Sequence, residues 1–210
     1  MGISKLSQVI RNILPLKYCG AVIVAAGTAS RMQGIDKVMA ELGGEPMILR
    51  TVRAFENCDV IGQIVIVTRE DLVEKIQALC AKYPKVTAVT IGGADRAESV
   101  RNGLKLLSPK VRLAAIHDGA RPLVTDAVID RTVRAAHRYG AAAPGVPVKD
   151  TVKVVRGGFV KSTRTEAPCR RCRPRRYLML TCLRVRWKRR KRTMRPLLTT
   201  ALQWNLWECL

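Results

Sequence analysis

Four short segments of the sequence carry residues suited to handling a phosphate, and the first runs from Ala25 to Lys37. It reads A-A-G-T-A-S-R-M-Q-G-I-D-K. Small residues such as Gly27 let backbone N–H groups approach a phosphate. The cations Arg31 and Lys37 lie beside the same loop, where they would suit a triphosphate undergoing substitution. The alternative is a strand and turn with two solvated cations. The segment contains neither G-x-x-x-x-G-K-[ST] nor G-x-G-x-x-G, which excludes an ordinary P-loop or dinucleotide site there.

The second segment, Gly92 to Val100, reads G-G-A-D-R-A-E-S-V. Its glycine pair, which includes Gly93, frees backbone groups to meet the flat edge of a base. Ser99 falls in the first turns of an expected helix, where its hydroxyl can face a phosphate or a sugar. The same residues are typical of a helix N-terminus, with Asp95 as the N-cap and Glu98 completing a capping box. Capping does not exclude an anion nearby, so both interpretations stay open.

The third segment, Ile116 to Pro122, reads I-H-D-G-A-R-P. Asp118 stands at the end of an expected strand, where a carboxylate can hold Mg²⁺ or a hydroxyl. Arg121 can hold an anionic group beside it. His117 should point to the opposite face of the strand, which favours a structural role for its ring.

The fourth segment, P-V-K-D-T-V-K over residues 147–153, is extended. Because side chains alternate along an extended chain, Thr151 and Lys153 are expected on one face. The segment follows a short apolar stretch that two prolines interrupt.

Strands and helices alternate along the chain before this point. Apolar or β-branched runs predict strands, and apolar residues at helical spacing predict helices. The expected strands are 21–26, 63–68, 86–91, 112–117 and a short 141–148; the expected helices are 46–57, 70–82, 95–107 and 125–138. This alternation predicts an α/β domain with a mainly parallel sheet. Ligands of such sheets gather at the carboxyl ends of the strands, where three of the four segments begin.

The charge of the chain is unevenly distributed. The formal charge is +22, yet residues 1–163 hold 24 Lys and Arg against 14 Asp and Glu, whereas residues 164–210 hold 14 against 2. All three Trp and four of the seven Cys also lie in residues 164–210. Such a basic balance suits nucleic acid, so a basic nucleic-acid-binding protein is an alternative of another class. Two compositions meet near Thr163, which predicts a domain boundary there.

The N-terminal residues 1–20 are predicted to be an extension of the domain. Lys and Arg interrupt their apolar residues, so they lack the apolar core of a signal peptide. No stretch of the sequence approaches the roughly 20 apolar residues that span a bilayer, and no membrane partner is expected. Cys19, Cys58 and Cys80 stand alone in apolar or helical surroundings, as buried thiols do in a reducing compartment. We therefore expect a cytoplasmic protein.

Taken in order, the four segments resemble the 2-C-methyl-D-erythritol 4-phosphate cytidylyltransferase family. Its members show A-A-G-x-G-x-R-M followed by a lysine, then G-G-x-x-R-x-x-S-V, H-D-x-A-R-P, and V-x-D-T-x-K opening a dimerisation arm. The likeness covers residues 21–163, with Ala29 where the family often has glycine. It implies a Rossmann-like three-layer nucleotidyltransferase fold with a mainly parallel sheet. It also implies an extended arm over about residues 149–163 and a homodimer formed through that arm.

The resemblance further implies a reaction and a set of site residues. CTP and methylerythritol phosphate would give CDP-methylerythritol and pyrophosphate, a step of isoprenoid precursor synthesis, by in-line attack on the α-phosphorus. By motif match, Arg31 and Lys37 are expected to be catalytic. The expected CTP-binding residues are Ala25, Ala26, Gly27, Gly93 and Ser99, and those facing the acceptor are Asp118, Arg121 and Thr151, with Asp118 also holding Mg²⁺ or another divalent cation. A cytidylyltransferase acting on ribitol 5-phosphate is an alternative with the same fold.

Residues 164–210 depart from the family and are interpreted as an out-of-frame basic tail rather than a folded domain. Family members continue after the arm with S-T-P-x-R, then A-V-Q-T-P-Q-x-F, and later L-T-D-D-C-S-A-V-E. Codons compatible with residues 172–182, with their synonymous bases chosen for this purpose, read V-Q-T-P-Q-V-F-D-A-D-L when regrouped one base earlier. Residues 197–210 treated in the same way read L-T-D-D-C-S-A-V-E-S-V-G-M-P. Two bases of most codons are fixed by the protein, so a single-base deletion near codon 164 accounts for the whole tail.

This interpretation displaces two others for the tail, and no specific nucleic-acid partner is expected. Cys169, Cys172, Cys182 and Cys209 invite a zinc site, although the last spacing is long. The run of Arg and Lys over residues 184–195 invites a nucleic-acid patch. If the frame has changed, the chain as written also lacks the family's arm arginine and its lysine near the carboxyl end. Inactivity of the chain as written is therefore an expectation.

Overall fold

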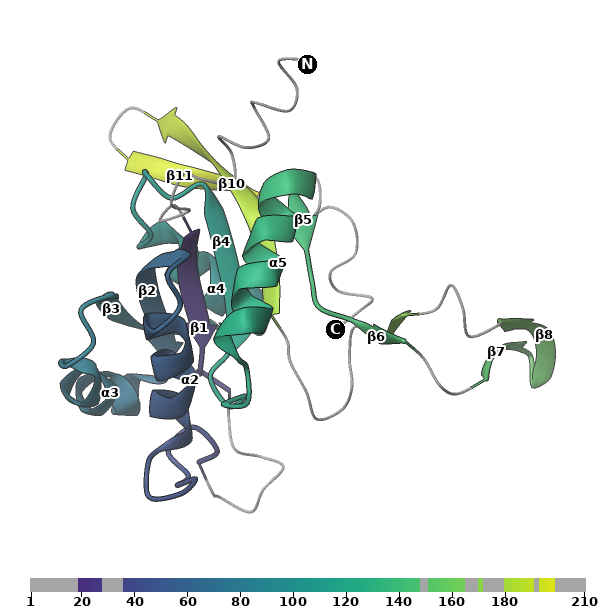
Figure 1. The fold of residues 1–210 in the computed structure, drawn as a ribbon, viewed down its shortest axis with the longest axis horizontal. Coiled ribbons are helices and arrows are strands. Elements are labelled where there is room, and N and C mark those ends of the chain that lie inside the picture. Colours follow the sequence, from purple (N-terminus) through teal and green to yellow (C-terminus); the bar gives the residue numbers. More distant parts are fainter. Residues whose placement is uncertain are drawn as a thin grey trace, which may run out of the picture.

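A seven-stranded sheet forms the centre of the molecule (Figure 1). The computed structural model describes residues 19–27, 36–147, 151–164, 170–171, 180–190 and 193–198 of the 210-residue chain. In the order in which they lie side by side, the strands are β11 (Thr193–Leu198), β10 (Leu180–Arg190), β4 (Leu113–Asp118), β1 (Cys19–Val24), β2 (Ile61–Thr68) and β3 (Val86–Ile91). The short β5 (Ala141–Ala142) pairs with β10 away from this path. The strands predicted from the sequence are confirmed within two residues, except the last, where only two short pieces form.

Helices cover both faces of the sheet and make three layers, as predicted. Helices α2 (Met47–Glu56), α3 (Val73–Cys80) and α5 (Asp126–Tyr139) pack on one face, and α4 (Arg96–Lys105) packs on the other. A turn of 3₁₀ helix, η1 (Glu70–Leu72), precedes α3.

Side chains alternate along the strands between these two faces. Ile64 and Ile66 of β2 join the core beneath α2 and α3, whereas Val65 and Val67 join the core beneath α4. Because both faces are buried, the central strands consist largely of apolar residues, which is why the sequence shows apolar runs there.

The carboxyl ends of the central strands meet at one edge of the sheet. Strand β1 runs parallel to β2 and to β4, and β2 runs parallel to β3. Val24 at the end of β1 pairs with Val67 on one side and with Asp118 on the other. The backbone continues this alignment beyond the strands, because Gly119 N donates to Val24 O at 2.7 Å and Ala25 N donates to Val67 O at 2.6 Å. Three of the four segments singled out in the sequence therefore start from the same edge.

Strand β10 belongs to the core, which corrects one expectation from the sequence. The prediction was that residues 164–210 pack no core, but β10 pairs antiparallel with β4 and buries Leu180, Cys182, Leu183 and Val185. These side chains are divided between the two faces of the sheet, so β10 contributes to the hydrophobic core on each face. For this strand the prediction is wrong, because apolar residues at strand spacing inside a basic segment were overlooked. The division of the chain at residue 163 by reading frame stays a prediction.

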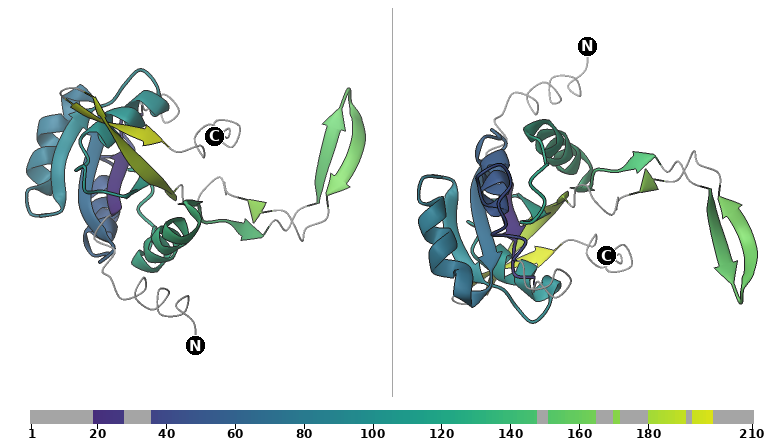
Figure 2. Two further views of the ribbon diagram at one scale, coloured as in Figure 1. Left: turned by 90° about the horizontal axis from the view of Figure 1, so that it is seen from above. Right: turned by 90° about the horizontal axis from the view of Figure 1, so that it is seen from below.

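A two-stranded hairpin projects from the body where the sequence predicted an arm (Figures 1 and 2). It consists of β7 (Val152–Arg156) and β8 (Phe159–Arg164). Gly157 and Gly158 form its two-residue turn with φ angles of 56° and 80°, a left-handed conformation that favours glycine. A second short pair, β6 (Val146–Pro147) with β9 (Arg170–Arg171), lies between the hairpin and the body. None of the helices in the described ranges is long and apolar enough to cross a bilayer.

Candidate active site

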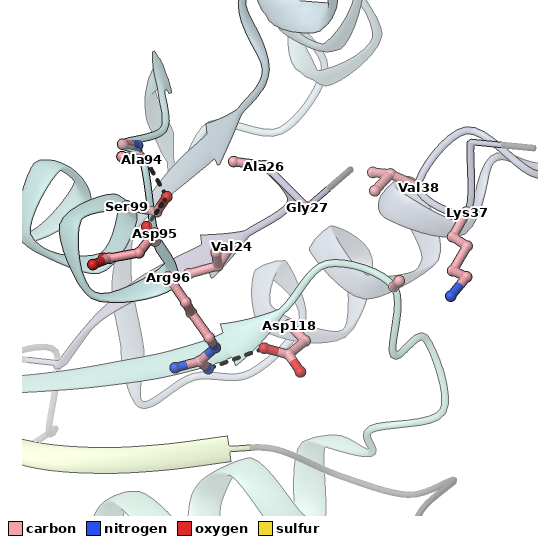
Figure 3. A pocket seen from close by; sticks show the side chains of 12 residues that line it. Val24, Ala26, Gly27, Lys37, Val38, Ala94, Asp95, Arg96, Ser99 and Asp118 are labelled. Atoms are coloured by element: carbon pink, nitrogen blue, oxygen red, sulfur yellow. Dashed lines mark hydrogen bonds and ion pairs between the residues drawn. The ribbon is translucent and has the colours of Figure 1, made fainter. Parts of the chain in front are cut away.

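A cleft of about 490 Å³ opens at the edge where the carboxyl ends of the strands meet (Figure 3). Four parts of the chain line it: the residues that follow β1, the turn that carries Lys37, the loop that enters α4, and the end of β4. The lining includes Ala26, Gly27, Lys37, Gly93, Arg96, Ser99, Asp118 and Ala120. Six of the residues that the sequence predicted for a site therefore face one cleft.

The loops that follow β1 and β3 approach each other closely at the cleft. A Cβ at Gly92 would overlap the Ala26 side chain and lie 2.9 Å from Ser99 Oγ, so only glycine fits there. Ala25, which was predicted to bind CTP, lies in the hydrophobic core and is 3% exposed. Its backbone N–H already donates to Val67 O. Ala25 therefore anchors the start of the loop in the core. Ala26 and Gly27 are the residues of this loop that line the cleft.

The loop entering α4 is held by four side-chain hydrogen bonds. Asp95 Oδ1 accepts from Glu98 N at 2.7 Å, which confirms the predicted N-cap. Glu98 Oε2 accepts from Ala94 N at 2.8 Å, one residue before the position of an ordinary capping box. Ser99 Oγ accepts from Gly93 N at 3.0 Å and donates to Asp95 O at 2.9 Å. The hydroxyl of Ser99 therefore fixes the shape of the loop as well as lining the cleft.

Asp118 lies between two arginines. Arg96 Nη2 donates to Asp118 Oδ1 at 3.0 Å, and Arg121 Nε donates to Asp118 Oδ2 at 2.8 Å. All three side chains are partly exposed, between 24% and 32%. Figure 3 shows Arg96 reaching from the start of α4 to Asp118 at the end of β4. Each guanidinium uses one nitrogen to bind the Asp118 carboxylate. Because a guanidinium has five N–H donors, its other N–H groups can bind an anion.

The loop that follows β4 is held from the core side. Thr51 Oγ1, in α2, donates to Gly119 O at 2.8 Å. His117 Nε2 lies 3.1 Å from Arg121 O, and because a carbonyl only accepts, the ring donates to it. The His117 ring is fully buried beside Phe55, with ring centroids 5.2 Å apart. The structural role predicted for His117 is confirmed.

Among the predicted site residues that the structure describes, Ala25, Arg121 and Thr151 are absent from the lining of the cleft. Arg31 lies outside the described residues, so its predicted role stays a prediction. Thr151 is exposed at the base of the hairpin and is absent from the lining. Its predicted contact with substrate stays a prediction.

Arg96 lines the cleft, but sequence reasoning left it without a role. The signal for Arg96 was present, because the family pattern G-G-x-x-R-x-x-S-V contains an arginine at this position. Its contact with Asp118 joins segments 22 residues apart, and no local pattern reports such a contact.

The described residues do not form a protein cage for a metal ion. No three His, Cys, Asp or Glu side chains gather within the described ranges as a metal site would require. Asp118 was predicted to hold Mg²⁺, but both of its oxygens accept hydrogen bonds from arginine. The carboxylate could ligate an ion most readily by releasing one arginine. An ion carried mainly by substrate phosphates fits this arrangement better than one held by the protein.

Comparison with known proteins identifies the family. The sequence profile of the 2-C-methyl-D-erythritol 4-phosphate cytidylyltransferase (IspD) family matches residues 19–187. The chain belongs to this family. The match continues past residue 163 into β10. The cytidylyltransferase of Geobacillus kaustophilus is 43% identical over 146 residues, covering 68% of this chain and 64% of that protein. The corresponding protein of Caldanaerobacter subterraneus is 41% identical over 138 residues, covering 64% and 61%.

Solved structures of the cytidylyltransferase family share the fold. The 4-diphosphocytidyl-2C-methyl-D-erythritol synthase of Anaerococcus prevotii superimposes with a TM-score of 0.69 at 25% identity, covering 80% of this chain and 72% of that one. The Thermus thermophilus cytidylyltransferase gives 0.52 at 26% identity, covering 78% and 69%. The chain spans less than two thirds of the length of the curated relatives described above.

Proposed function

We propose that this protein is a nucleotidyltransferase that transfers CMP from CTP to 2-C-methyl-D-erythritol 4-phosphate and releases pyrophosphate. The observation that carries the proposal is the cleft itself. Two glycine-containing loops, at Gly27 and Gly93, and the cations Lys37 and Arg96 line it. The cleft lies where the carboxyl ends of the strands meet. The chain belongs to a family whose members are named 2-C-methyl-D-erythritol 4-phosphate cytidylyltransferases.

The reaction requires little covalent chemistry from the protein. The acceptor phosphate attacks the α-phosphorus of CTP in line, and negative charge spreads towards the leaving pyrophosphate. The backbone beside Gly27 and Gly93 would receive the nucleotide, with Lys37 beside its phosphates, as Arg31 is also expected to be. Asp118 with Arg121 would orient the acceptor. Fixed cations stabilise the transition state more than the ground state, because they are already in place when the charge develops.

We propose that a divalent cation, Mg²⁺, accompanies the triphosphate. When bound, it would neutralise phosphate charge and help to orient the leaving group. Asp118 is the carboxylate of the cleft nearest to this role, although Arg96 and Arg121 hold it in the structure.

We propose a homodimer formed through the hairpin. Val155, Phe159 and Val160 are 53–78% exposed on this projecting element, and exposed apolar side chains gathered in one place favour an interface. A second copy of the chain would also give Thr151 a cleft to reach. Light scattering of the parent and of Phe159→Asp tests this: loss of a dimer in the variant supports it, and a monomeric parent contradicts it.

Two further expectations belong to the proposal. The regrouped codons support a change of reading frame near residue 164, which resequencing of the coding DNA tests. The cysteines of the domain are free and buried, which supports a cytoplasmic location for the protein.

Binding of Mg·CTP tests the proposal without requiring turnover. Isothermal titration of the chain as written should give saturable binding of Mg·CTP and weaker binding of Mg·ATP. Lys37→Ala should weaken Mg·CTP binding only modestly, because the backbone amides still hold the triphosphate. No binding of CTP, together with salt-sensitive binding of DNA, would favour the nucleic-acid alternative.

A further inference from the structure

Arg69, immediately after β2, is held between two carboxylates. Its Nη2 donates to Asp36 Oδ2 at 2.6 Å, and its Nε and Nη2 each lie 3.0 Å from an oxygen of Asp71. The Arg69 and Asp36 side chains are 26% and 22% exposed. The hydrogen bonds to Asp71 and then to Asp36 raise the pKa of Arg69, so its charge is secure. Arg69 itself does not line the cleft.

Asp36 in turn organises the turn that carries Lys37. Its Oδ1 accepts from Val38 N at 3.0 Å, and its backbone oxygen accepts from Met39 N at 3.1 Å and from Ala40 N at 2.8 Å. One oxygen of the Asp36 side chain thus binds the backbone of the turn, and the other binds Arg69. The turn is therefore anchored to the end of β2 through a single ion pair.

The core side of the same turn is also fixed. Val38 is 5% exposed, and its carbonyl oxygen accepts from Ile48 N at 3.0 Å. Lys37 lies between this buried residue and Asp36 and lines the cleft. Its backbone position is therefore determined on both sides, by packing at Val38 and by the ion pair at Asp36.

We infer that Arg69 is a positioning residue for Lys37. Through Asp36 it fixes the turn from which the ammonium reaches the cleft, and the inference rests on the proposed function of that cleft. Lysine has a long flexible side chain, so a fixed backbone is the main means of placing its charge. A displacement of about 1 Å at a reacting group is enough to reduce turnover severely.

The charge of Arg69 has a second effect on Lys37. Asp36 is the direct neighbour of Lys37, and an unpaired carboxylate there would attract the ammonium away from a bound phosphate. Arg69 binds Asp36 Oδ2, so this oxygen does not compete with a phosphate for the Lys37 ammonium. None of the ion pairs between described residues involves Lys37. Arg69 thus fixes the turn and neutralises its carboxylate.

Two measurements on the full chain test this inference, and neither requires turnover. The first is hydrogen exchange of the amides of Val38, Met39 and Ala40. The second is acetylation of Lys37 by acetic anhydride, followed by mass spectrometry with and without Mg·CTP. Both are made on the parent, Arg69→Gln, Arg69→Lys and Asp36→Asn. The matched control is Arg134→Gln, which breaks an ion pair of 2.7 Å with Asp130 on α5.

In Arg69→Gln, the three amides should exchange about tenfold faster, as expected for losing one charge-assisted hydrogen bond that holds a turn. Protection of Lys37 by Mg·CTP should fall about threefold or more, which is the loss expected when the ammonium no longer meets the triphosphate in one geometry. Arg69→Lys should restore part of both effects, since it keeps the charge with fewer donors. Arg134→Gln should change neither.

Unchanged exchange and unchanged protection in Arg69→Gln would overturn the inference. If Arg69→Gln does not fold, Asp36→Asn decides instead, because it keeps the side-chain oxygen for Val38 and removes the charge that Arg69 binds. If Mg·CTP fails to protect Lys37 in the parent, the nucleotide role of Lys37 is refuted together with the inference about its positioning. The exchange rates then still show whether Arg69 holds the turn, so the two failures are distinguishable.

Discussion

Arg96 at the start of α4 and Asp118 at the end of β4 are joined across the cleft, with Arg96 Nη2 donating to Asp118 Oδ1 at 3.0 Å. This contact links the loop expected to receive the nucleotide with the residues expected to face the acceptor. In frame-restored protein, Arg96→Gln should therefore lower kcat/KM for the acceptor phosphate about tenfold, which corresponds to losing one charge-assisted hydrogen bond. The Kd for Mg·CTP should change much less. Steady-state kinetics with each substrate varied in turn measure both. If Arg96→Gln changed only the kinetic constants for CTP, the proposed role of the Arg96–Asp118 pair in orienting the acceptor would be contradicted.

Lys37 is expected to act on the transition state. In frame-restored protein, Lys37→Ala should reduce kcat by about 100-fold, the loss typical of removing one preorganised donor. Lys37→Arg should not rescue fully, because a planar guanidinium cannot occupy the position of an ammonium. Rates of pyrophosphate release at saturating substrates give kcat directly. A variant with normal kcat and a raised KM for CTP would assign Lys37 to ground-state binding alone.

The burial of β10 predicts a stability effect that separates the structure from the expectation that residues 164–210 are not folded. Leu183 is 3% exposed and belongs to the core cluster beneath α4, so Leu183→Ala should lower the free energy of unfolding by about 2–5 kcal/mol. Leu123→Ala is the matched control, because Leu123 is 63% exposed. Urea denaturation of both variants measures the difference. Equal stability of the two would show that β10 is not part of the core and that the whole tail lacks one.

Buried thiols predict a loss of stability at alkaline pH. Burial raises the pKa of Cys80 from about 9 to about 11, and a hydrogen bond with Cys182, then burial, raises the pKa of Cys19. A thiol whose folded pKa lies above its unfolded pKa stabilises the protein below the unfolded value. The free energy of unfolding should therefore fall as the pH rises from about 9 to about 11. Urea denaturation across this range should show a smaller fall for Cys80→Ala than for the parent; an identical fall would assign it to other groups.

The sequence predicted the fold and most of the cleft because both depend on local patterns. Apolar runs on a sheet buried from both sides identify the central strands, and parallel strands bring residues that follow them, such as Gly27 and Asp118, to one edge. The capping signal at Asp95 is likewise local, and its hydrogen bond forms as predicted.

What the sequence did not predict depends on pairings between distant segments. Arg69 reaches Asp36 across 33 positions, and no spacing rule indicates such an ion pair. Strand β10 was missed because arginines separate its apolar residues, and only its place beside β4 shows that Leu180 and Cys182 belong to the core. Ala25 was expected to bind CTP from its motif, but the close approach of Gly119 to its side chain places it in the core.

Release of pyrophosphate from CTP tests the proposed activity most directly. The chain as written and a version with the reading frame restored near codon 164 would be compared, each with CTP, Mg²⁺ and either 2-C-methyl-D-erythritol 4-phosphate or ribitol 5-phosphate. We predict turnover by the frame-restored protein with methylerythritol phosphate, and far less with ribitol 5-phosphate. Omitting the metal should abolish it. No turnover with methylerythritol phosphate, or good turnover with ribitol 5-phosphate alone, would contradict the proposed function.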